Sequence, residues 1–157
     1  MSRDPSVTMG LVRDFVGRRR LALAGASRSG KKFGSVLLRE LKARGYDVVP
    51  VHPAAADLEG IPCARDLSAL RGRVDGLVVV TPPSETAGLV AAAADAGIGA
   101  VWIQQGAESE AALAVARERG LAVVHGHCLL MFLPGASGFH GFHRVLWRLL
   151  GKLPAGP

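Results

Sequence analysis

The stretch LALAGASRSGKKFG, residues 21–34, decides the fold. Its apolar start at 21–24 predicts a buried strand, and the small residues at 25–30 predict a tight turn. A helix with one apolar face is expected to begin near Phe33. A strand, a glycine turn and a helix N-terminus in this order form an anion site. Backbone N–H groups and the positive end of the helix dipole both point at the turn.

The rest of the chain alternates short apolar strands with helices. The expected strands are 46–51, 74–81, 100–103 and 121–125, and the expected helices are 7–17, 66–70, 84–96, 108–119 and 139–150, with a loop at 54–62. This alternation predicts an α/β fold with three layers, a Rossmann-like, doubly wound parallel sheet of about five strands. We expect a single domain over 1–157, with a nucleotide-binding core at 21–128.

The composition fits such a sheet and an anionic ligand. Hydrophobic residues make up 49% of the chain and aromatic residues 5%, as expected for a parallel sheet buried on both faces. The formal net charge of +6 favours an anionic partner. Scarce aromatic residues and scattered charges argue against nucleic acid. The most apolar window, 87–103, is interrupted by Asp95, Gly97 and Gly99, which argues against a membrane span.

The cysteines and the N-terminus point to a reducing compartment. Cys63 and Cys128 are too few for a disulfide framework and lack the spacing of zinc ligands. The N-terminus has no apolar segment of the kind found in secretory signals, so we expect a cytoplasmic location. His125, His127 and Cys128 do not suggest a metal site, because position 128 faces away from the other two on a strand.

Three kinds of phosphate ligand compete for the glycine turn. Residues 25–31 fit the G-x-x-x-x-G-K pattern of a nucleoside triphosphatase, but Lys32 stands at the next position, where Ser or Thr must hold Mg²⁺. A dinucleotide site is weakened by Ser27, which replaces the second glycine, and by His52, where NAD requires an acidic residue. An NADP-type oxidoreductase stays open, because the ribose of NADP carries a phosphate.

The third ligand carries several phosphates and needs no metal. Arg28, Lys31 and Lys32, with Arg39 as a further candidate, suit a pyrophosphate accompanied by a 3′-phosphate. Segments along the chain resemble, in order and spacing, the small stand-alone CoA-binding proteins and the CoA-binding domain of succinyl-CoA synthetase-type ligases. These segments are Gly-Ala-Ser at 25–27, Lys-Phe-Gly at 32–34, Val-His-Pro at 51–53, Thr-Pro-Pro at 81–83, Trp-Ile-Gln-Gln-Gly-Ala-Glu at 102–108 and Val-Val-His-Gly-His-Cys at 123–128.

The resemblance implies a Rossmann-like domain that binds coenzyme A at the C-terminal ends of the strands. It implies that the phosphates are surrounded by Gly25, Ala26, Ser27, Arg28, Lys32, Phe33 and Gly34. The adenosine would be bordered by His52 and Pro53. The opposite wall would be formed by Thr81, Pro82 and Pro83, and the far side by Gln105 and Gly106. The sequence departs from the family at His52, which is usually Asn, and at Gln105, which is usually Pro. Ser27 is also a candidate N-cap of the helix.

Cys128 is expected at the same sheet edge as the ligand. The adjacent histidines favour its thiolate, so we hypothesise a mixed disulfide with the CoA thiol. The edge turns contain no convincing catalytic acid or base, so the chain is expected to bind CoA, or a short acyl-CoA, without a complete active site. The alternatives are an NADP-type oxidoreductase and a CoA-ligase component that needs a partner chain; a homodimer or an unidentified protein partner also stays open.

Overall fold

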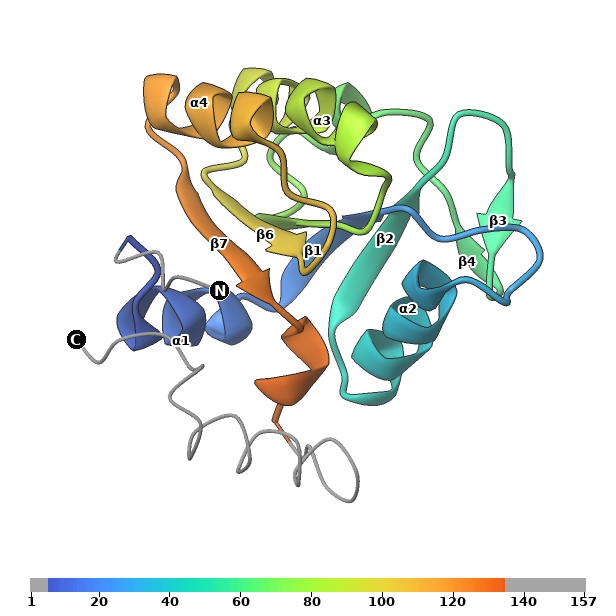
Figure 1. Cartoon of the computed structure of the whole chain (residues 1–157). Coiled ribbons are helices and arrows are strands. Elements are labelled where there is room, and N and C mark those ends of the chain that lie inside the picture. Colours follow the sequence, from blue (N-terminus) through green and yellow to red (C-terminus); the bar gives the residue numbers. More distant parts are fainter. Residues whose placement is uncertain (1–5, 135–157) are drawn as a thin grey trace.

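The computed structural model describes residues 6–134, which form one parallel five-stranded sheet with helices on both faces (Figure 1). The strands are β1 (Arg20–Ala24), β2 (Asp47–Val51), β5 (Gly76–Val79), β6 (Ala100–Gln104) and β7 (Ala122–His127). Their order is β2-β1-β5-β6-β7, so the chain reverses its direction of travel at β1. The expected Rossmann-like α/β sheet is confirmed. The helix expected at 139–150 lies outside the described residues.

The helices make the outer two of three layers. α1 (Met9–Gly17) and α2 (Phe33–Ala43) cover one face. α3 (Pro83–Asp95), α4 (Glu110–Glu118) and the 3-10 turn η1 (Leu67–Leu70) cover the other. The central strands β5 and β6 are buried along their whole length, as expected between two helical layers. None of the described helices is both long and apolar enough to span a membrane.

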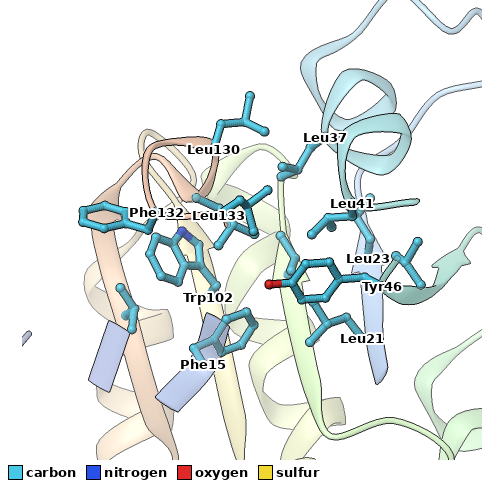
Figure 2. Packing of buried hydrophobic residues seen from close by; sticks show 14 of the residues in the cluster. Phe15, Leu21, Leu23, Leu37, Leu41, Tyr46, Trp102, Leu130, Phe132 and Leu133 are labelled. Atoms are coloured by element: carbon cyan, nitrogen blue, oxygen red, sulfur yellow. The ribbon is translucent and has the colours of Figure 1, made fainter. Parts of the chain in front are cut away.

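Trp102 on β6 is the centre of the core on the α1 side (Figure 2). Its ring lies 5.6 Å from the ring of Phe15 and 5.8 Å from that of Phe132, measured between centroids. Phe132 follows the 3-10 turn η2 (Leu129–Met131), which folds back from the end of β7. The indole N–H donates to the carbonyl of His127 at 3.2 Å, so the buried ring keeps its hydrogen bond.

Two helix starts differ from those expected, because side-chain caps decide them. α1 begins at Met9, since the Thr8 hydroxyl accepts the Leu11 N–H at 3.2 Å. α4 begins at Glu110, since the Ser109 hydroxyl accepts the Ala112 N–H at 3.1 Å. A capping hydroxyl fixes the first turn of a helix more sharply than the apolar pattern does.

The expected loop at 54–62 contains a short antiparallel hairpin, so that part of the prediction was wrong. β3 (Asp57–Leu58) pairs with β4 (Ile61–Pro62), and strands of this length show no periodicity in the sequence. At the tip, Glu59 has a φ of 52°, a left-handed conformation that is uncommon outside glycine. The chain then returns to the sheet edge, where Ala64 bridges to Val51.

α2 rests directly on the glycine turn, backbone against backbone. A Cβ on Gly34 would lie 2.4 Å from the carbonyl oxygen of Gly25, and a Cβ on Gly25 would lie 2.5 Å from that of Val80. Gly25 also has a φ of 121°, which other residues rarely adopt. The helix, the turn and the end of β5 therefore touch without space for a side chain, and this contact places the N-terminus of α2.

Two glycine substitutions in helices test this contact. Gly34→Ala should lower the free energy of unfolding by about 1–3 kcal/mol, because its methyl group meets backbone that cannot rotate away. Gly88→Ala in α3 is the matched control, since nothing lies within 4 Å of a Cβ there, and it should stabilise by about 0.5–1 kcal/mol. Urea unfolding measures both. An unchanged midpoint for Gly34→Ala would show that the helix is not seated as described.

Candidate functional site

A cavity of about 1010 Å³ opens at the carboxyl ends of the strands. It lies where the strand order reverses, between the turn that follows β1 and the residues that follow β2, β5 and β6. Open α/β sheets bind their ligands at this position. The volume is at the upper end of the range of about 300–1,000 Å³ for small-molecule pockets. The cavity therefore has room for an extended nucleotide.

The structure brings nearly all of the sequence-predicted site residues to this one cavity. It is lined by Gly25, Ala26, Ser27, Arg28, Lys32, Phe33, Gly34, His52, Pro53, Thr81, Pro82, Pro83, Gln105, Gly106 and Cys128. Lys31 is outside this lining, and its backbone N–H donates to the Ser29 hydroxyl at 3.3 Å. Segments far apart in the sequence thus meet at one edge of the sheet, while their contacts with a ligand stay a prediction.

Ser35, which the sequence analysis missed, holds the glycine turn in place. Its buried hydroxyl accepts the Ser27 N–H at 3.1 Å and donates to the Ser27 carbonyl at 3.2 Å. The hydroxyl of Ser27 lies 3.0 Å from that of Ser29, so the interpretation of Ser27 as the cap of α2 is wrong. The sequence offered one indication of this role, because Ser35 stands on the apolar side of the first turn of α2.

The two helix N-termini that line the cavity have no side-chain caps. Lys32 is the N-cap residue of α2 and Pro82 that of α3, and neither side chain accepts a first-turn N–H. In contrast, hydroxyl groups cap α1 and α4. The partial positive charge at the start of α2 therefore faces the cavity without a capping side chain, which suits an anionic ligand.

Unpaired cations line the cavity on two sides. Arg28 and Lys32 lie beside the glycine turn, and Arg65 lies between the end of β2 and η1. Among the residues that the structure describes, none of these three head groups has an ion-pair or hydrogen-bond partner. Arg39 is outside the lining, because its Nη1 donates to the Glu59 carboxylate at 2.8 Å and to the Gly30 carbonyl at 3.3 Å. Arg39 therefore stabilises the glycine turn from outside the cavity.

His52 closes the cavity at the end of β2. Its Nδ1 accepts the N–H of Ala54 at 3.1 Å and that of Ala55 at 2.9 Å, which assigns the ring proton to Nε2. The side-chain oxygen of asparagine accepts the same kind of hydrogen bonds in an Asx turn. The departure from the usual Asn therefore preserves the turn that follows β2.

The far side of the cavity is fixed by hydrogen bonds to the end of β7. The buried Gln104 side chain accepts the Leu129 N–H at 3.1 Å, and the Gln105 N–H donates to the His127 carbonyl at 3.2 Å. Proline has no N–H, so Gln105 adds a hydrogen bond that the usual residue cannot make. The half-buried thiol of Cys128 lines the cavity next to this turn.

His127 is a weak source of positive charge for the Cys128 thiolate. Burial lowers the pKa of its imidazole, with a further lowering from nearby His125 and a smaller opposite effect from Glu108. The imidazole is therefore mostly neutral at pH 7. His127 therefore stabilises the Cys128 thiolate less than the sequence led us to expect.

Residues 19–134 match a protein family described as the CoA binding domain. A conserved hypothetical protein from Pyrococcus furiosus is 35% identical, with a TM-score of 0.68 over 71% of this chain and 96% of that one. A dinucleotide forming acetyl-coenzyme A synthetase 1 from Ca. Korarchaeum cryptofilum is 26% identical, with a TM-score of 0.64 over 72% of this chain but 27% of the synthetase. The uncharacterized protein YneT of Bacillus subtilis is 22% identical over 111 residues, which cover 71% of this chain and 82% of YneT.

Substitutions of His52 test its structural role. His52→Asn should leave the free energy of unfolding within about 0.5 kcal/mol of the parent, because its amide oxygen can accept the N–H groups of Ala54 and Ala55. His52→Ala should cost about 1 kcal/mol, since both groups lose their acceptor. Chemical denaturation measures both. Equal losses for Asn and Ala would contradict the assigned hydrogen bonds.

Proposed function

We propose, since the chain belongs to the CoA-binding domain family, that its cavity binds coenzyme A or a short acyl-CoA. The observation that carries this proposal is the content of one cavity: an uncapped helix N-terminus behind a glycine turn, unpaired cations and, on the far side, a thiol. CoA has the complementary groups, a pyrophosphate, a further phosphate on the ribose and a terminal thiol on a flexible arm.

The pyrophosphate is proposed to lie at the glycine turn. The close contact of Gly34 with Gly25 brings the start of α2 to the glycine turn at the cavity, where N–H groups and the helix dipole favour an anion. Arg28 and Lys32 add formal charge at the same place. No metal is needed to balance the phosphates in this arrangement.

The pantetheine arm is proposed to cross the cavity from the turn toward Cys128. Phe33 supports this path, since its side chain lines the cavity and is 40% exposed, unusual for a large apolar residue in the described part of the chain. Apolar and small side chains continue the lining through Thr81, Pro82 and Gly106. A thiol at the end of the arm would then lie near that of Cys128.

The chain is proposed to lack a complete active site of its own. The hydroxyl of Ser27 is hydrogen-bonded to that of Ser29, and Nδ1 of His52 accepts hydrogen bonds from two backbone N–H groups. The synthetase match covers only 27% of that enzyme, which keeps open a CoA-ligase component that works with a partner chain. An NADP-type oxidoreductase is the other alternative, and a homodimer is compatible with either.

Calorimetry and native mass spectrometry test the ligand. CoA should copurify with the freshly prepared protein or bind it in solution, and NADP should bind at least tenfold more weakly. Arg28→Gln should weaken CoA binding about fivefold to tenfold, because it removes a cation beside the pyrophosphate. Arg117→Gln on α4 is the control of equal charge change and should have no effect. The proposal fails if NADP binds and CoA does not.

The thiol hypothesis concerns Cys128 alone. We propose that its thiolate attacks the disulfide of oxidised CoA, which forms the protein–CoA disulfide and releases one CoA thiol. Cys63 is outside the cavity, and burial raises the pKa of its thiol, so it should not compete. Neither Cys63 nor Cys128 is in a disulfide within the described residues, and the reducing, cytoplasmic compartment stays a proposal.

Intact-mass spectrometry after treatment with CoA disulfide tests this step. The parent and Cys63→Ser should gain the mass of one CoA less two hydrogens and lose it with a reductant. Cys128→Ser should gain nothing. An adduct that persists in Cys128→Ser, or no adduct in the parent, would refute the hypothesis.

A further inference from the structure

The cations around the cavity come from opposite faces of the sheet. Arg28 and Lys32 belong to the turn that leads into α2, which packs on one face. Arg65 precedes η1, which packs on the other face. A ligand in the cavity therefore meets positive charge at two separate places.

The backbone next to Arg65 is anchored firmly to the sheet edge. The Ala64 N–H donates to the Pro50 carbonyl at 3.0 Å, and the His52 N–H donates to the Ala64 carbonyl at 2.9 Å. This parallel bridge adds one residue, Ala64, alongside the edge strand β2. Arg65 is thus held beside His52 and Pro53, at the wall where the adenosine is expected.

A second cavity of about 450 Å³ adjoins this wall. It shares Arg65 and Asp66 with the main cavity, and Arg73 and Ser68 also line it. Neither Arg65 nor Arg73 makes an ion pair or a side-chain hydrogen bond among the described residues, although the charge of Arg65 acts on the adjacent Asp66 carboxylate. Ion pairs are made elsewhere by Arg18, Arg20, Arg39, Arg44 and Arg119. Two unpaired guanidinium groups around one hollow form a matching surface for a doubly charged phosphate.

We propose that Arg65, together with Arg73 from the second cavity, binds the phosphate monoester on the ribose of the ligand, which in CoA is the 3′-phosphate. The glycine turn and Arg28 then serve the pyrophosphate, so the two anionic groups of CoA are read by separate parts of the site. This inference rests on the proposed function and adds to it the basis for selecting CoA over 3′-dephospho-CoA.

Asp66 lies next to Arg65 and carries the opposite charge, so a substitution there changes the charge of the site in the opposite direction. Its carboxylate accepts the Ser68 hydroxyl at 2.5 Å and the Ala69 N–H at 3.2 Å, and these hydrogen bonds lower the pKa of the carboxyl. The group is therefore ionised at neutral pH and opposes a neighbouring phosphate. Asparagine caps a helix start about as well as aspartate, so Asp66→Asn removes the charge and keeps the cap.

Titration of two ligands against the parent and the variants tests the proposal. Arg65→Gln should weaken CoA binding roughly tenfold and leave 3′-dephospho-CoA within twofold of the parent. Asp66→Asn should tighten CoA binding severalfold and also leave 3′-dephospho-CoA unchanged. Arg117→Gln, which lines neither cavity, should change neither ligand.

The outcomes separate this proposal from the function on which it rests. If the parent binds CoA and Arg65→Gln weakens both ligands equally, or neither, the proposal is overturned while the proposed function stands. If the parent binds neither ligand, the proposed function itself fails. Inorganic phosphate should not bind when CoA is present; if it does so in an Arg65-dependent manner, the arginines serve a separate phosphate and the proposal is overturned.

Discussion

The site depends on a backbone contact between three elements. Gly34 of α2 lies against Gly25 of the turn, and Gly25 lies against Val80 at the end of β5. Because no side chain separates them, the N-terminus of the helix is brought to the point where the strand order reverses. Leaving this terminus uncapped gives up about 1 kcal/mol that a capping hydroxyl would contribute. A bound anion can replace that interaction, so the same contact that seats the helix also prepares it for a ligand.

The distribution of charge reinforces this arrangement. Outside the cavity lining, arginines on β1 and α2 and at the C-caps of α1, α2 and α4 are paired with carboxylates, and such exposed pairs contribute little to stability. At the cavity, Arg28, Lys32 and Arg65 have no partner in the described part of the chain. The carboxylates of Asp66 and Glu85 line the same hollow but form no ion pair with these cations, so an anionic ligand still meets a net positive charge there. The affinity of the cavity for an anionic ligand should therefore fall as the ionic strength rises.

The sequence predicted the sheet and most of the cavity lining because local signals are strong there. Apolar runs specify the strands, and Gly25 and Gly34 specify the turn, whose position follows from the strand before it. The sequence favoured Arg39 as a further phosphate ligand and did not point to Arg65, which lines the cavity in its place. Arg39 is turned away by Glu59, which sits at the tip of a hairpin too short to show a pattern. Ser35 was missed for a related reason: its hydrogen bonds join residues that meet only after α2 folds back.

The proposed lack of a complete active site follows from how the polar groups of the cavity are already hydrogen-bonded. A ligase or a dehydrogenase needs groups that move protons or phosphate, and the imidazole of His52 already accepts two backbone hydrogen bonds. Thr81 lies beside Thr86 without a base in hydrogen-bond contact. The thiol of Cys128 is different, because thiolates react with disulfides without a catalytic partner. Under the proposed function, the cavity holds CoA and Cys128 exchanges its thiol, whereas the alternative of a CoA-ligase component would depend on a partner chain for the groups that move phosphate.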